Sequence, residues 1–137
     1  MFVEIPPDQR IEVLKVFKQI VGEAPINSIA LFHRSGATLL FFSEYASDSV
    51  LLLSAASESM FATGGMVCQR MDLGELREIL IRGEKGYTIL LFSDLILAGA
   101  GSDVSTLAIA LRAFRMNFAR IHAIFHPEFA KKHNLMF

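Results

Sequence analysis

The chain has 137 residues, of which 53% are hydrophobic and 20% are charged, and its formal net charge is −1. This length predicts one domain with a substantial core, and the high apolar content excludes an intrinsically disordered protein. The near-neutral charge, without a basic patch interleaved with aromatic residues, argues against nucleic acid or an anionic membrane surface as a partner.

The single cysteine, Cys68, excludes an internal disulfide framework and a zinc site built on several thiolates. Residues 1–7 lack the basic and apolar regions of a signal peptide, which favours a cytoplasmic protein. The longest nearly apolar stretch, residues 87–101, is too short for a helix that spans a bilayer, so no membrane span is expected. A mean hydropathy of +0.44 nevertheless favours a partner chain that covers apolar surface.

The first part of the sequence predicts a helix followed by a β-hairpin. Apolar residues recur at helical spacing after Asp8, the expected N-cap, and this pattern ends at Gly22. Residues 27–33 and 38–43 are apolar runs joined by a turn that contains Gly36, which predicts two paired strands. Because the runs are continuous rather than alternating, we expect a sheet that is covered on both faces.

Residues 47–70 form a second expected helix, which is unusually poor in charge. Glu58 is the only charged residue between positions 49 and 69, and apolar residues occupy most of the cylinder. A helix of this kind is usually buried on two sides. Gly64 and Gly65 leave two interpretations open, namely a close approach to another helix or a kink or end of this one.

The second half predicts three strands and a last helix. The strands are expected at residues 75–82, 87–92 and 95–100, and their short connections indicate an antiparallel meander. Asp103, with the serine before it, is expected to cap a helix whose apolar stripe runs over residues 104–121. The fold class is therefore α+β, in the order α-β-β-α-β-β-β-α, with one five-stranded antiparallel sheet between helical layers.

No motif in the sequence supports catalysis or a bound cofactor. The P-loop pattern and the nucleophile-elbow pattern G-x-S-x-G are both absent. Gly99 and Gly101 precede a helix, but Val104 stands where a dinucleotide-binding loop needs its third glycine, and no strand follows that helix. The expectation is a tight strand-to-helix turn in a protein that is not an enzyme and that binds no cofactor.

Two histidines raise the question of a metal site. His122 and His126 are four residues apart, which places them on one face of a helix, and Glu128 or His133 would have to supply a third ligand. Pro127 disturbs the helix at that point. We therefore expect surface histidines and no bound metal.

The order of these elements, together with two segments, resembles the roadblock family. The segments are residues 28–36, which form the first hairpin, and residues 76–87, which carry the turn Gly-x-x-Gly-Tyr. The family includes dynein roadblock light chains, bacterial activators of polarity GTPases and the scaffold subunits of Rag-type GTPases. The resemblance covers residues 8–122, and it departs from the family at Ser35, where an acidic residue is usual.

This resemblance implies a non-catalytic, dimerising module that binds, scaffolds or regulates a small Ras-like GTPase. It places the dimer interface, with a second copy or a paralogue, on the middle helix and the third strand. The residues expected there are Val50, Leu53, Ser57, Met60, Phe61, Gly64, Gly65, Cys68, Leu76, Ile79 and Ile81. The alternative is a small-molecule-sensing α/β domain, which would need a pocket with convergent polar groups.

The expected domain covers residues 1–122, and residues 123–137 form an apolar tail outside it. A chain end this apolar is expected to dock on an apolar surface of the same or a neighbouring chain. The residues expected to dock are Phe125, Phe129, Leu135, Met136 and Phe137.

Overall fold

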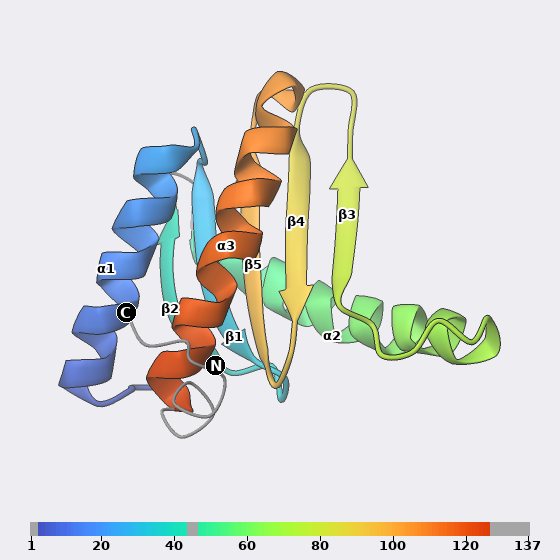
Figure 1. Cartoon of the computed structure of the whole chain (residues 1–137), viewed down its shortest axis with the longest axis horizontal. Coiled ribbons are helices and arrows are strands. Elements are labelled where there is room, and N and C mark those ends of the chain that lie inside the picture. Colours follow the sequence, from blue (N-terminus) through green and yellow to red (C-terminus); the bar gives the residue numbers. More distant parts are fainter. Residues whose placement is uncertain (1–2, 44–46, 127–137) are drawn as a thin grey trace.

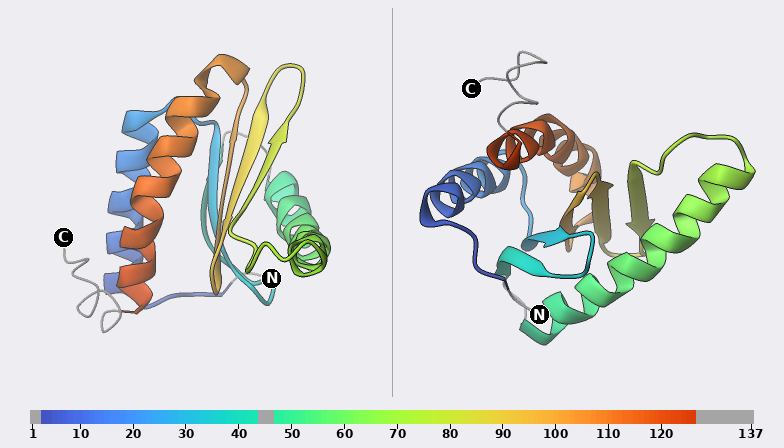
Figure 2. Two further views of the ribbon diagram at one scale, coloured as in Figure 1. Left: turned by 45° about the vertical axis from the view of Figure 1, so that its right-hand side comes forward. Right: turned by 90° about the horizontal axis from the view of Figure 1, so that it is seen from below.

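The computed structural model describes residues 3–43 and 47–126, apart from the side chains of residues 43–52. Its elements are α1 (Pro7–Glu23), β1 (Ser28–His33), β2 (Thr38–Ser43), α2 (Ser47–Arg70), β3 (Glu78–Arg82), β4 (Tyr87–Phe92), β5 (Leu95–Gly101), a 3₁₀ turn η1 (Val104–Thr106) and α3 (Leu107–Phe125). The expected α-β-β-α-β-β-β-α order is confirmed. Helices α1 and α3 cover one face of the sheet and α2 crosses the other, which gives three layers (Figure 1, Figure 2).

The sheet has five antiparallel strands in the order β2-β1-β5-β4-β3. Its central seam pairs β1 with β5, from Ser28 opposite Ala100 to His33 opposite Leu95. Strands β1, β4 and β5 are almost wholly buried because helices cover both faces, which explains their continuous apolar runs. Strands β2 and β3 form the two edges, and every residue of β3 is at least partly exposed.

The larger core lies between the sheet and the antiparallel pair α1 and α3. The helices contribute side chains that are almost completely buried: Val13, Val16, Phe17, Ile20, Ala110, Ala113, Phe114 and Ile121. Phe114 lies directly over Gly99 of β5, where any side chain would overlap the phenyl ring. Gly101 accommodates the ring of Tyr87 in the same way. These two glycines therefore serve close packing within a strand, not the turn that the sequence suggested.

A smaller core lies on the other face of the sheet, beneath α2. Its buried members are Ala30, Phe32, Leu90, Phe92, Ile96 and Ala98. Helix α2 runs obliquely across this face and continues past β3, so that its last turns project beyond the edge of the sheet (Figure 1; right-hand view of Figure 2). In the part of the chain that the structure describes, no helix combines the length and apolar character that a membrane crossing requires.

Two starts of elements differ from the expectation. Pro6 rather than Asp8 occupies the N-cap of α1, and Asp8 lies in the first turn. Proline at the first helical position has no N–H to satisfy, and Arg10 N closes the turn by donating to Pro6 O at 2.9 Å. Strand β3 begins at Glu78 instead of residue 75, because the preceding loop, in which Asp72 and Gly74 take positive φ of 57° and 82°, extends that far.

The last helix also differs at both ends. Asp103 caps the 3₁₀ turn η1, where its Oδ1 accepts from Ser105 N at 3.0 Å, and α3 begins only at Leu107. The helix continues to Phe125, so the boundary expected after residue 122 falls inside it. Gly64 and Gly65 do not end α2, which is helical through Arg70.

Candidate interaction surface

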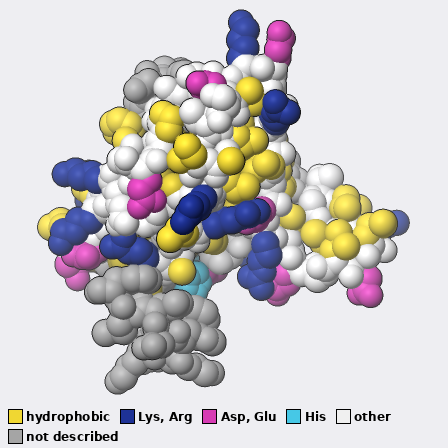
Figure 3. Space-filling view, turned by 45° about the horizontal axis from the view of Figure 1, so that its top comes forward, with side chains coloured by type: hydrophobic (Ala, Val, Ile, Leu, Met, Phe, Trp, Pro, Cys, Tyr) yellow, Lys and Arg dark blue, Asp and Glu magenta, His cyan; other side chains and the backbone are white. Residues whose placement is uncertain are grey.

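The projecting end of α2 and the edge strand β3 carry large apolar side chains into solvent. Met66 and Val67 are 54% and 51% exposed, and two residues of the following loop reach 66%. Figure 3 shows apolar side chains gathered on this projecting end, at the right of the molecule. The α2–β3 surface, as used below, consists of Met66, Val67, Met71, Leu73, Leu80 and Ile81.

Strand β3 adds an open backbone edge to this surface. It pairs with β4 on one side, and among the described residues no strand pairs with its other side. Leu80 and Ile81 point to opposite faces of the sheet, and each is more than 40% exposed. An apolar edge strand with unpaired N–H and C=O groups is a template for another chain.

The first half of α2 is fixed to the turn between β1 and β2. Ser54 Oγ donates to Gly36 O at 2.9 Å, and the Glu58 carboxylate lies against Gly36, whose φ of +94° favours glycine. One turn further along, the Arg34 guanidinium stacks over the Phe61 ring, 4.5 Å from its centroid. The helix is therefore anchored at one end, and its other end has no sheet beneath it.

The structure separates the residues expected at the dimer interface into groups. Five are half-buried and pack on the core beneath α2: Leu53, Met60, Phe61, Leu76 and Ile79. Ser57 is fully buried, and its Oγ donates to Leu53 O at 2.7 Å. Val50 lies in α2, but its side chain is outside the described residues. Of the remaining four, Ile81 belongs to the α2–β3 surface, and Gly64, Gly65 and Cys68 are half-buried.

The two glycines of α2 have different surroundings. A Cβ atom at Gly64 would lie 2.8 Å from Leu76 Cδ2, so the helix closely approaches the segment before β3 of its own chain. A Cβ atom at Gly65 would meet nothing within 4 Å. Close approach within the chain therefore explains Gly64, and Gly65 leaves an open position beside the projecting end.

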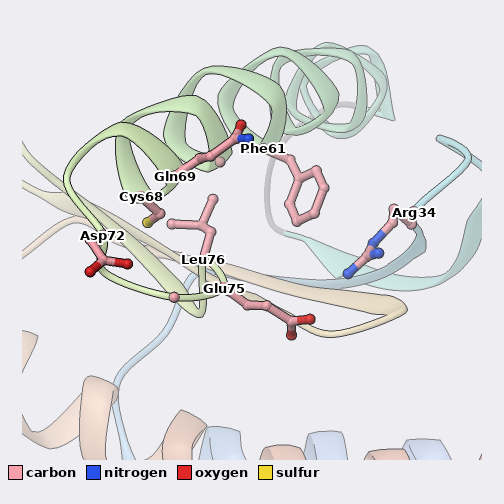
Figure 4. A pocket seen from close by; sticks show the side chains of 9 residues that line it. Arg34, Phe61, Cys68, Gln69, Asp72, Glu75 and Leu76 are labelled. Atoms are coloured by element: carbon pink, nitrogen blue, oxygen red, sulfur yellow. The ribbon is translucent and has the colours of Figure 1, made fainter.

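A cavity of about 490 Å³ opens between the end of α2 and the β1–β2 turn (Figure 4). Arg34 and Phe61 lie side by side at one end, and Leu76 occupies the middle. Asp72 and Glu75 lie on either side of Leu76 and do not converge on a common point. A site for a polar small molecule needs convergent polar groups, so this cavity gives little support to the ligand-sensing alternative.

A bidentate ion pair ties β3 to α3. Arg115 Nε and Nη2 donate to the two carboxylate oxygens of Glu78 at 2.7 and 2.6 Å. The hydrogen bonds from Arg115 lower the pKa of Glu78, against the opposing effect of partial burial, and the positive charge of Arg115 acts in the same direction. The pair holds the edge strand in place from the side opposite α2.

The histidines of α3 are not the simple surface residues that the sequence suggested. His122 and His126 are partly buried, and each lies within 3.2 Å of the carboxylate of Asp94 in the β4–β5 turn. The side chain that joins the two histidines is thus Asp94, which lies in a segment that the sequence alone did not connect with them. Glu128 and His133, the ligands considered before, lie outside the described residues.

Only the first of the expected docking residues of the tail is described. Phe125 is half-buried at the end of α3 and packs, with Ile124, against the core between the sheet and α1. The other four lie outside the described residues: Phe129, Leu135, Met136 and Phe137. Docking of this segment stays a prediction.

Solved structures share this fold. Gliding protein MglB from Thermus thermophilus matches 89% of this chain and 94% of its own, with a TM-score of 0.80 and 12% identity. A Roadblock/LC7 domain from Streptomyces avermitilis matches 82% of this chain and 96% of its own, with a TM-score of 0.72 and 16% identity. An MglB structure with a tetrameric arrangement matches 87% and 88%, with a TM-score of 0.71 and 12% identity.

At the level of sequence, no family model and no curated protein matches the chain. The likeness is therefore one of three-dimensional structure, and in these three comparisons it covers 82–89% of this chain and 88–96% of the other chain. The chain has the roadblock fold, which confirms the fold that the resemblance of its segments implied.

Proposed function

We propose that this protein is a non-catalytic, dimerising module that binds a small Ras-like GTPase and scaffolds or regulates it. The roadblock fold supports this proposal, because it is typically non-catalytic and occurs in a family that includes GTPase-regulating modules. The observation that carries the dimerising part of the proposal is the α2–β3 surface, a group of exposed apolar side chains next to an open strand edge.

A second copy of the chain is the occupant that best fits this surface. Two copies related by a two-fold axis would bring their β3 edges together and continue the sheet from one protomer into the other. The projecting end of each α2 would then lie over the partner's half of the extended sheet. This arrangement covers Met66, Val67 and Ile81 and pairs the open edge at the same time. The tetrameric arrangement of an MglB structure with the same fold is consistent with self-association of this chain.

The effect on a GTPase is proposed to come from binding rather than from chemistry of this chain. A binding protein shifts the equilibrium between the two nucleotide-dependent conformations of a GTPase only if its affinity for them differs. A tenfold preference corresponds to about 1.4 kcal/mol. Equal affinity for both states would make the protein a scaffold.

The test is titration of the purified protein with Ras-like GTPases from the same organism, each loaded either with GDP or with a non-hydrolysable GTP analogue. We expect saturable binding to one GTPase, measured by calorimetry or fluorescence anisotropy, and a preference for one state if the role is regulatory. A heat-denatured GTPase serves as the control. If no GTPase binds in either nucleotide state, the result would contradict the proposal and favour the ligand-sensing alternative.

A further inference from the structure

The end of α3 brings two imidazoles and one carboxylate to a single point. His122 Nε2 lies 3.2 Å from Asp94 Oδ1, and His126 Nε2 lies 2.6 Å from Asp94 Oδ2. The two rings, one helical turn apart, have centroids separated by 4.5 Å. One ligand atom from each of the three residues lies within 4.8 Å of the other two.

The backbone on both sides of this cluster is well fixed. In the β4–β5 turn, Ser93 N donates to Leu95 O at 2.8 Å and Leu95 N donates to Ser93 Oγ at 3.1 Å. Arg34 steadies the same turn from outside, since its Nη2 donates to Ser93 O and its backbone N to Asp94 O. On the helix, His126 N donates to His122 O at 2.9 Å. The donors are therefore held by a turn and a helix end that pack against the core.

The set of donors selects the class of ion. Two imidazole nitrogens and one carboxylate oxygen suit Zn²⁺ and the neighbouring divalent transition metals, whereas Mg²⁺ and Ca²⁺ prefer sites made of oxygen. Bonds of about 2.0–2.2 Å to zinc place ligand atoms roughly 3.3 Å apart, so small side-chain rotations would admit an ion. The side chains of His126 and Asp94 are 40% and 47% exposed, which leaves an open side for water as a fourth ligand.

We infer that Asp94, His122 and His126 form a binding site for one divalent transition-metal ion of the Zn²⁺ class. The ion would replace the hydrogen bond between His126 and Asp94 and would cross-link the β4–β5 turn to the C-terminal end of α3. Because the three donors come together only in the folded chain, binding would stabilise the native state. The site is separate from the α2–β3 surface, so it stands whether or not the chain binds a GTPase.

The experiment is a calorimetric titration of the tag-free, EDTA-treated protein with ZnCl₂ alone. We expect one ion per chain and a higher Tm in the presence of zinc. The variants His126→Ala and Asp94→Asn are expected to bind zinc at least about tenfold more weakly. His33→Ala is the matched control, because His33 is an exposed histidine whose ring bonds Ser35 instead of this cluster. This control should bind zinc as the parent protein does.

A second measurement keeps the result independent of folding. Co²⁺ added to the parent protein should give the visible absorption of a nitrogen- and oxygen-ligated ion, and the bands should be lost in His126→Ala, whose helical content is checked by circular dichroism. Absence of zinc binding by the parent protein would overturn the inference. An equal loss in His33→Ala, or a loss in His133→Ala with His126→Ala unaffected, would overturn this choice of ligands.

Discussion

Gly64 and Gly65 are neighbours in α2, yet only one of the two positions has room for a side chain. Glycine inside a helix costs up to about 1 kcal/mol relative to alanine, so replacement should be favourable wherever a methyl group has room. Gly65 has that room, and Gly64 does not because Leu76 lies in the way. The pair thus offers a test in which helix propensity is the same and only the surroundings differ.

We expect Gly65→Ala to raise the free energy of unfolding by about 0.5–1 kcal/mol. Gly64→Ala should gain nothing or destabilise the fold, since the new methyl group displaces the side chain of Leu76. Urea unfolding of both variants, at one protein concentration, measures the difference. An equal gain from both substitutions would show that Leu76 does not constrain the helix.

The ion pair between Glu78 and Arg115 predicts a dependence of stability on pH. The pKa of Glu78 is lowered in the folded state, so its contribution is complete above the ordinary pKa of a glutamate and is lost as the pH falls through the lower, folded-state value. Glu78→Gln should therefore lower Tm at pH 7, by about 2–4 °C. The difference between the variant and the parent protein should disappear under strongly acidic conditions.

Glu75→Gln is the matched control for this measurement. The Glu75 side chain is 82% exposed, and its Oε2 lies 3.5 Å from Arg77 Nη2, so this pair is looser and better solvated than the one between Glu78 and Arg115. Thermal unfolding followed from pH 7 to pH 3 should show a much smaller effect for this variant. A constant difference between Glu78→Gln and the parent protein over the whole range would contradict the role of the charge.

Among the elements, the packing of α3 on β5 depends on the absence of a side chain at Gly99. Gly99→Ala should lower the free energy of unfolding by about 1–3 kcal/mol, because the methyl group forces Phe114 and the helix away from the sheet. The double variant Gly99→Ala with Phe114→Leu should recover part of this loss relative to the sum of the single changes. Urea unfolding of all three proteins tests the coupling, and strict additivity would contradict it.

The elements that the sequence predicted well are those whose signal is local. Apolar spacing of three and four residues marks α3, and continuous apolar runs next to turns that contain glycine mark β1, β2 and β4. The start of β3 was missed because it depends on a loop with positive φ at Asp72, a residue type that gives no strong signal for that conformation. The 3₁₀ turn η1 was missed because Asp103 caps either kind of helix.

For the candidate site residues, too, the sequence showed what is local and not what depends on the tertiary fold. The low charge of α2 predicted that the helix has two apolar sides, but it could not say which side faces the chain's own sheet. The residues expected at the interface lie largely on the inner side, as Met60 does, whereas the exposed Val67 and Met71 of the proposed dimer surface were not among them. Asp94 was missed as a partner of the histidines, because only the tertiary fold brings the β4–β5 turn to α3.

For the whole molecule, the proposed dimer predicts a mass in solution of twice 15.2 kDa. Met66→Arg should shift the mass toward one chain, because a charge on the projecting helix would have to be buried against the partner. Met116→Arg is the control, since Met116 is a methionine of α3 that is 62% exposed and lies outside the α2–β3 surface. Light scattering on a size-exclusion column, at tens of micromolar, distinguishes the two masses. A parent protein with the mass of one chain would contradict the dimer.

The central seam of the sheet also governs how the chain reaches its structure. The hairpins on either side close short loops, whereas pairing β1 with β5 joins segments separated by α2 and three further strands. Loop-closure entropy opposes such a distant contact until most of the chain is collapsed, which slows folding relative to a helical bundle of this length. During synthesis on the ribosome, the β1 edge of the β1–β2 hairpin stays unpaired until β5, which ends at Gly101, has left the exit tunnel. During that interval the nascent chain is a natural client for chaperones that bind extended apolar segments.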